Sequence, residues 1–137
     1  MFLLCIAWYE WYPAPAYHFT GIDISAGDII KLTVTASSTT SGNATVENQT
    51  RNQTVSQRLN STAALCLRNA EWIVEDFELS GALSPFANFS AVTFTNAEAT
   101  GNQTLTPLGA TTVNIQQNDQ ILTSVLTSES CVTIQYV

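Results

Sequence analysis

Residues 70–78, Ala-Glu-Trp-Ile-Val-Glu-Asp-Phe-Glu, alternate with a period of two, as the residues of a β-strand do. This period places Glu71 and Glu75 on the same face of the expected strand. One interpretation is an edge strand whose charges discourage sheet-to-sheet association. The other is a functional site, which the adjacent Trp72 favours because an aromatic wall desolvates a carboxylate.

The composition of the whole chain also indicates β structure. Of the 137 residues, 45% are hydrophobic and only 11% are charged, so the chain is too apolar to be disordered. Thr, Val and Ile are abundant and turn residues recur at short intervals, which is typical of all-β proteins. We find no internal repeat and no linker, and we expect a single domain over residues 1–137.

Further strands are expected about every ten residues, separated by polar turns. This spacing predicts an antiparallel β-sandwich of two sheets. Asn118 and Asp119 form a predicted tight turn near the end of the chain. The additional strands are predicted at residues 2–12, 22–25, 29–36, 43–48, 54–59, 90–99, 111–116, 120–126 and 131–137.

The charge balance excludes some classes of partner. The chain has four Lys and Arg against eleven Asp and Glu, a formal net charge of −7, and no basic stripe, which argues against nucleic-acid binding. No apolar stretch is long enough to span a membrane. A chain with so few basic residues gains little positive charge when its carboxylates protonate, so acidic media are compatible with its fold.

Glycosylation motifs indicate a secreted protein. Six Asn-x-Ser/Thr motifs occur, whereas chance would give about two or three. The apolar start at residues 1–7 has no basic region before it and runs into an aromatic stretch, so we do not interpret it as a working signal peptide. The candidate glycosylation sites are Asn43, Asn48, Asn52, Asn60, Asn88 and Asn102.

Carboxylates are the most plausible chemical groups for a site. The single histidine, His18, has no second ligand at metal-binding spacing, and no nucleophile motif surrounds a Ser or Cys, so we expect no metal and no cofactor. Glu10 and Glu75 lie in aromatic-rich segments and could meet on one sheet face. A glutamate there could activate water as a general base, or two could act as the acid and base of glycoside hydrolysis.

Five blocks of sequence carry a resemblance that covers residues 7–137 in order. They are Trp8-Tyr9-Glu10-Trp11-Tyr12-Pro13, Ile24-Ser25-Ala26-Gly27-Asp28, Ala44-Thr45-Val46-Glu47-Asn48, residues 69–77 (Asn-Ala-Glu-Trp-Ile-Val-Glu-Asp-Phe), and residues 92–99 (Val-Thr-Phe-Thr-Asn-Ala-Glu-Ala). Through these blocks the chain resembles the fungal glutamic peptidases, the eqolisins. The resemblance implies a concanavalin-A-like sandwich and a secreted peptidase that cleaves protein at acidic pH without a metal. We expect a monomer acting on protein or peptide substrates.

The resemblance also implies roles for particular residues. The catalytic glutamate of the Val-Glu-Asp-Phe block falls on Glu75, which would act as general base on the attacking water and then protonate the leaving amine. The substrate-binding residues of the Trp-Tyr-Glu-Trp-Tyr-Pro block fall on Trp8, Glu10 and Tyr12. The cysteine that precedes the catalytic strand in the family falls on Cys66.

Two family features have no counterpart here. The resemblance places the catalytic glutamine in an upstream Ile-Leu-Gln-x-Gly-Val-Asp-like block. It places the cysteine expected to pair with Cys66 elsewhere in the first third of the usual catalytic domain, which has no counterpart here. Three cysteines, Cys5, Cys66 and Cys131, leave at least one unpaired within the chain. The resemblance therefore implies a domain without its N-terminal strands and partner glutamine, and we expect reduced or no activity as written. None of the glutamines present matches that block: Gln49, Gln53, Gln57, Gln103, Gln116, Gln117, Gln120 and Gln135.

Two other functions remain open from the residues. The first is a carbohydrate-active or lectin-like sandwich, with an acid pair among Glu10, Glu71 and Glu75 and with Trp8 and Trp72 as sugar platforms. The second is a non-catalytic domain that only binds peptides. A pair of carboxyls at glycosidase spacing favours the first, whereas an isolated glutamate on the binding face favours a peptidase.

Overall fold

The computed structural model describes residues 5–79 and 81–137, and every regular element in this part of the chain is a β-strand. All strand pairs are antiparallel, which confirms the all-β prediction. The chain forms two compact units, Met1–Asn69 and Ala70–Val137, and each is described by itself. That residues 1–137 make one domain stays a prediction. None of the described residues forms a helix of the length and apolarity that crossing a membrane requires.

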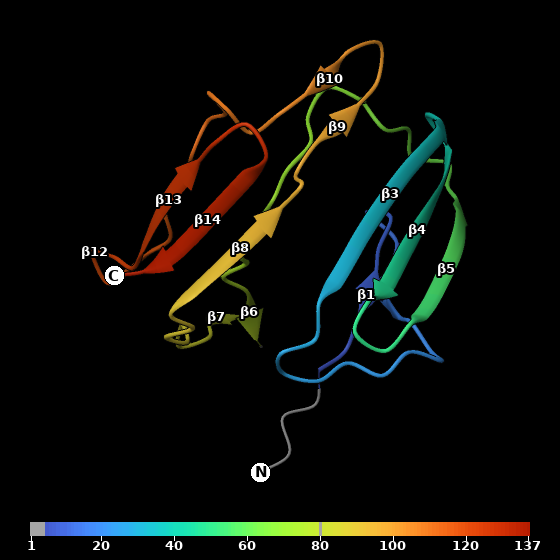
Figure 1. The fold of residues 1–137 in the computed structure, drawn as a ribbon. Coiled ribbons are helices and arrows are strands. Elements are labelled where there is room, and N and C mark those ends of the chain that lie inside the picture. Colours follow the sequence, from blue (N-terminus) through green and yellow to red (C-terminus); the bar gives the residue numbers. More distant parts are fainter. Residues whose placement is uncertain (1–4, 80) are drawn as a thin grey trace. The chain divides into compact units, whose positions relative to one another are not determined.

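The first unit is built on a three-stranded sheet with the order β3-β4-β5 (Figure 1). The strands are β3 (Ile30–Ser38), β4 (Ser41–Asn48) and β5 (Gln53–Asn60), as the sequence predicts to within a few residues. Asn52, in the turn between β4 and β5, has a φ of 55°, a conformation that asparagine tolerates better than most residues. Val46 of the central strand is only 3% exposed, whereas Val34 of the edge strand β3 is 84% exposed.

A short ribbon of β1 (Trp8–Tyr9) and β2 (Tyr17–His18) completes the regular structure of the first unit. The ring of Tyr9 contacts that of Phe19 edge to face at a centroid distance of 4.9 Å. Trp11 lies over Gly42 of β4, and its indole Nε1 donates to Ala63 O at 2.9 Å. The predicted strand over residues 2–12 is wrong in extent: only Trp8 and Tyr9 pair, and residues 1–4 lie outside the described part.

The second unit contains the sheet β13-β14-β8, formed by Thr123–Thr127, Cys131–Tyr136 and Ala91–Thr95. Its core is Ala97, Val132 and Ile134, each at most 6% exposed. Partly buried hydrophobic side chains pack around this core: Trp72, Val74, Phe89, Phe94 and Val125.

Three two-stranded ribbons precede or separate the strands of this sheet along the chain. They are β6 (Glu78–Leu79) with β7 (Ala82–Leu83), β9 (Ala99–Thr100) with β10 (Thr104–Leu105), and β11 (Gln116–Gln117) with β12 (Gln120–Ile121). The turn at Asn118 and Asp119 is confirmed, with φ values of 50° and 61° that suit a tight hairpin. The strand predicted at residues 111–116 is wrong except at its last residue. The strand predicted at 90–99 is interrupted at Asn96, where φ is 52°.

The predicted strand over residues 70–78 is wrong for residues 70–77, because the described residues offer no neighbouring strand to hydrogen-bond with it. Within residues 5–79 and 81–137, the only backbone hydrogen bond to this segment outside a ladder is from Ser84 N to Phe77 O, at 3.1 Å. Exposure nevertheless alternates residue by residue from Glu71 to Phe77, so the predicted two-faced character of this segment is confirmed.

Candidate active site

Glu75 points outward from the segment 71–77 of the second unit. Trp72, Val74 and Asp76 are half-buried, whereas Glu71, Ile73, Glu75 and Phe77 are exposed. This alternation follows from extended backbone, in which successive side chains point to opposite sides. The Glu75 carboxylate makes no hydrogen bond or ion pair among the described residues, so it is free to contact water or a ligand.

The inward side chains of this segment fix it against the core of the second unit. Trp72 and Val74 pack on the cluster of Ala97, Val132 and Ile134. Trp72 therefore faces the core while Glu75 faces away from it. The interpretation of Trp72 as an aromatic wall against this carboxylate is wrong, because neighbours an odd number of residues apart lie on opposite faces.

Asp76 is held by a glutamine that the sequence analysis did not single out. Gln117 Nε2 lies 3.0 and 3.1 Å from the two carboxylate oxygens of Asp76 and 2.9 Å from Ser84 O. Gln117 precedes the tight turn of the β11–β12 hairpin. No local signal in the sequence connects it with Asp76, because the two residues are 41 positions apart.

The predicted substrate-binding residues are all exposed in the first unit. Trp8, Glu10 and Tyr12 are exposed, with 49% of Trp8 and 82% of Tyr12 accessible, whereas Tyr9 and Trp11 are half-buried. His18 is the register partner of Trp8 across the β1–β2 ribbon and is exposed. Glu75 belongs to the other unit, so a groove that joins it to Trp8, Glu10 and Tyr12 stays a prediction.

In the first unit, a polar network connects the loop before β3 with the turn between β4 and β5. Asp28 Oδ2 accepts hydrogen bonds from Asn48 Nδ2 at 2.7 Å, from Ser25 N at 2.9 Å and from Arg51 Nε at 2.8 Å. The Asn48 amide, the Ser25 backbone N–H and the Arg51 guanidinium hold the pKa of Asp28 below its usual value, because all three stabilise the charged carboxylate. Only 7% of the Asp28 side chain is exposed.

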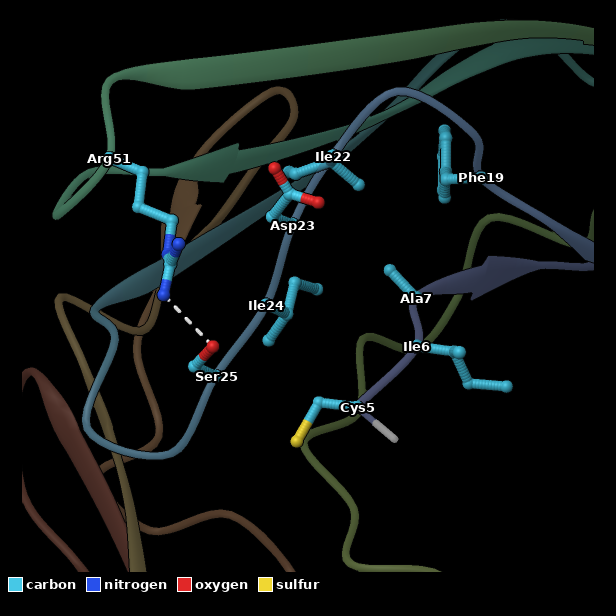
Figure 2. Close-up of a pocket in the computed structure, with 9 residues that line it drawn as sticks. All are labelled: Cys5, Ile6, Ala7, Phe19, Ile22, Asp23, Ile24, Ser25 and Arg51. Atoms are coloured by element: carbon cyan, nitrogen blue, oxygen red, sulfur yellow. Dashed lines mark hydrogen bonds between the residues drawn. The ribbon is translucent and has the colours of Figure 1, made fainter. Parts of the chain in front are cut away.

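A pocket of about 350 Å³ lies beside this network (Figure 2). Figure 2 shows the bond from Arg51 Nη2 to Ser25 Oγ, 2.9 Å long, at one side of the pocket. The guanidinium uses Nε to bond Asp28 and one Nη2 hydrogen to bond Ser25, and its charge is paired with the Asp28 carboxylate. The remaining lining residues are Cys5, Ile6, Ala7, Phe19, Ile22, Asp23 and Ile24.

The six candidate glycosylation sites differ in accessibility. Asn48 is 1% exposed, and its Nδ2 donates to both Asp28 and Asp23 O, so a glycan on this nitrogen would break the network. Asn43 is half-buried and bonded to Thr45 and Ser56. Exposed side chains are found at Asn52, Asn60, Asn88 and Asn102, where glycosylation stays a prediction.

Cysteine and metal chemistry contribute nothing to the described geometry. Cys5, Cys66 and Cys131 are free, and the pairing that the resemblance implies for Cys66 stays a prediction. Residues 5–79 and 81–137 contain no group of three His, Cys, Asp or Glu side chains placed to hold a metal ion.

Comparison with known proteins identifies close relatives. Residues 5–136 match the Peptidase A4 family. The chain is 53% identical over 134 residues to aspergillopepsin-2 of Aspergillus niger and 43% identical over 141 residues to scytalidopepsin B of Scytalidium lignicola. These alignments cover 96% of this chain but 48% and 54% of the relatives, so the chain spans about half the length of the curated relatives it matches.

A solved structure shares the fold. The crystal structure of aspergilloglutamic peptidase from Aspergillus niger superposes with a TM-score of 0.89 at 52% sequence identity. The match covers 96% of this chain and 79% of that one. This likeness confirms the fold class predicted from the sequence.

Proposed function

Because this chain belongs to the Peptidase A4 family, we propose that it forms part of an acid endopeptidase in which Glu75 is the general base. The observation that carries the proposal is the isolated, outward-facing Glu75 carboxylate on the Val-Glu-Asp-Phe block. A general base must reach a water molecule and the substrate, and a carboxylate with no partner among the described residues meets that requirement.

Glu75 would take part in two proton transfers. Its carboxylate accepts a proton from water as the water oxygen attacks the scissile carbonyl carbon, which produces a tetrahedral intermediate. The protonated Glu75 then gives this proton to the leaving amine as the C–N bond breaks. One side chain thus serves as base and then as acid, and it returns to its starting state after each turnover.

Trp8, Glu10 and Tyr12 are the proposed substrate-binding residues. Their side chains are exposed, and two of them offer broad aromatic surfaces to a peptide. The proposed substrates are proteins and peptides, with no cofactor. We further propose a secreted, monomeric protein, which the exposed motifs at Asn52, Asn60, Asn88 and Asn102 and the scarcity of basic residues support.

The carbohydrate-active alternative is disfavoured by spacing along the segment. Glu71 and Glu75 share a face, but four residues of extended chain separate their Cα atoms by about 13 Å. A retaining glycosidase places its carboxyls about 5 Å apart and an inverting one about 6.5–9.5 Å apart. These two residues therefore do not form a glycosidase pair.

The decisive experiment is proteolysis of a protein substrate at about pH 2–4, within the acidic range that the family resemblance implies. The chain is assayed alone and with the family's upstream segment, which carries the Ile-Leu-Gln-x-Gly-Val-Asp-like block, supplied as a second polypeptide. We expect cleavage that pepstatin does not inhibit when the upstream segment is supplied, and reduced or no cleavage by the chain alone. We expect Glu75→Gln to reduce kcat about 10²–10⁴-fold, because general acid–base catalysis contributes that much.

Glu71→Gln is the matched control, because Glu71 is exposed on the same face and the change is chemically identical. Equal losses in the two variants would contradict a specific role for Glu75. A folded protein that cleaves nothing in either form would contradict the peptidase proposal and leave peptide binding or carbohydrate recognition as the alternatives.

A further inference from the structure

Gln117 joins three parts of the second unit through one amide group. Its Nε2 donates to both carboxylate oxygens of Asp76 and to Ser84 O. Ser84 N in turn donates to Phe77 O at 3.1 Å. Asp76, Phe77, Ser84 and Gln117 therefore form a closed set of contacts around the residue that follows Glu75.

The chemistry of the partners fixes the orientation of this amide. A carboxylate and a backbone carbonyl are both acceptors, so the side chain must present its NH₂ group to them rather than its oxygen. Both N–H groups are thereby used. Gln117 is half-buried and cannot at the same time donate to the oxyanion of a peptide substrate. It is not a substitute for the family's catalytic glutamine.

The hairpin that carries Gln117 is itself fixed to the buried sheet. Leu122 N donates to Ile115 O at 2.8 Å across the base of the hairpin. Ile115 N donates to the hydroxyl of Thr123, which is 1% exposed and begins β13. Gln117 thus holds Asp76 from a well-anchored position.

We propose that Gln117 is a positioning residue for Glu75, an inference that rests on the proposed peptidase function. By holding the Asp76 side chain inward, Gln117 directs the neighbouring Glu75 outward, because adjacent residues of an extended chain point to opposite sides. Residues 70–77 have no strand partner among the described residues, so this contact and the packing of Trp72 and Val74 take the place of a ladder.

Gln117→Met tests the proposal by removing both donors while keeping an unbranched chain of similar length. Gln116→Met is the matched control, since Gln116 is the preceding residue in the hairpin and is exposed. We expect Gln117→Met to lower kcat about 10- to 100-fold, because small displacements of a catalytic group have effects of this size. KM should change less than about twofold, since Gln117 is not among the residues proposed to bind the substrate.

A second readout does not depend on activity. Amide hydrogen exchange of Ser84, whose N–H is bonded to Phe77 O, should accelerate about tenfold or more in Gln117→Met and stay unchanged in Gln116→Met. In a protein that already carries Asp76→Leu, Gln117→Met should have little further effect on kcat. The effects of two substitutions that remove the same contact are not additive.

Unchanged Ser84 exchange in Gln117→Met would overturn the positioning role, whatever the activity. Fully additive losses in the Asp76→Leu background would overturn it as well. The proposed peptidase function is contradicted by a different result, namely if the Glu75→Gln variant cleaves protein as fast as the unmodified chain. In that case Ser84 exchange still decides whether Gln117 holds the segment.

Discussion

Replacement of Asn48 by alanine tests the stability of the first unit. Asn48 ends the central strand β4 and is 1% exposed. Its Nδ2 donates to Asp23 O at 2.8 Å and to Asp28 Oδ2 at 2.7 Å, and its Oδ1 accepts from Arg51 N at 3.1 Å. One side chain therefore ties the loop before β3 to the turn between β4 and β5.

The expected loss follows from these bonds. The two bonds to backbone groups, Asp23 O and Arg51 N, contribute about 1 kcal/mol each, so Asn48→Ala should lower the free energy of unfolding by at least about 2 kcal/mol. Loss of the bond to Asp28 adds to this figure. With a urea dependence of about 1–3 kcal/mol per molar, the unfolding midpoint should fall by about 1 M.

Urea unfolding, followed by tryptophan fluorescence, measures this loss, because Trp11 lies over the same sheet. The protein is produced without glycosylation, since Asn48 lies in a glycosylation motif. Asn60→Ala is the control, because Asn60 is an exposed asparagine at the end of β5 in the same sheet, and it should cost less than about 0.5 kcal/mol. Equal midpoints for the two variants would refute the reasoning from burial and hydrogen bonding.

Two further predictions concern the same unit. Asp28→Asn should lower the free energy of unfolding at neutral pH, because the charged Asp28 carboxylate is stabilised in the folded state. Since the pKa of Asp28 is lowered by folding, this stabilisation is present above the ordinary value of about 3.9 and is lost as the pH falls through the folded-state pKa. The difference in free energy of unfolding between the two proteins should therefore persist down to about pH 4 and shrink below it. Urea midpoints across that range measure the difference, and a constant difference down to pH 2 would contradict the assignment. Gly42→Ala should lower the free energy of unfolding by about 1–3 kcal/mol, because an added Cβ would lie 2.6 Å from Thr35 O. Gly101→Ala is the control: an added Cβ there meets nothing within 4 Å, so the thermal midpoint should be nearly unchanged. Equal thermal midpoints for the two variants would be evidence against the close contact at Gly42.

Local patterns predicted which residues share a face of a segment better than they predicted strand pairing. The period of two at residues 71–77 correctly separated Glu75 from the inward Trp72, because alternation follows from the backbone alone. The same pattern wrongly indicated a paired strand, since pairing requires a second segment at hydrogen-bonding distance. The tight turn at Asn118 and Asp119 was predictable because both residues tolerate positive φ.

The sequence by itself determined the β-rich character, the turn at Asn118 and Asp119, the family blocks and the placement of Glu75 and Trp72 on opposite faces, because composition, periodicity and turn chemistry act over a few neighbouring residues. Tertiary structure alone decided that Asn48 is buried and that Gln117 binds Asp76. Asn48 meets Asp28 across 20 positions and Gln117 meets Asp76 across 41. Contacts of that separation depend on how distant segments pack, and no local pattern encodes them.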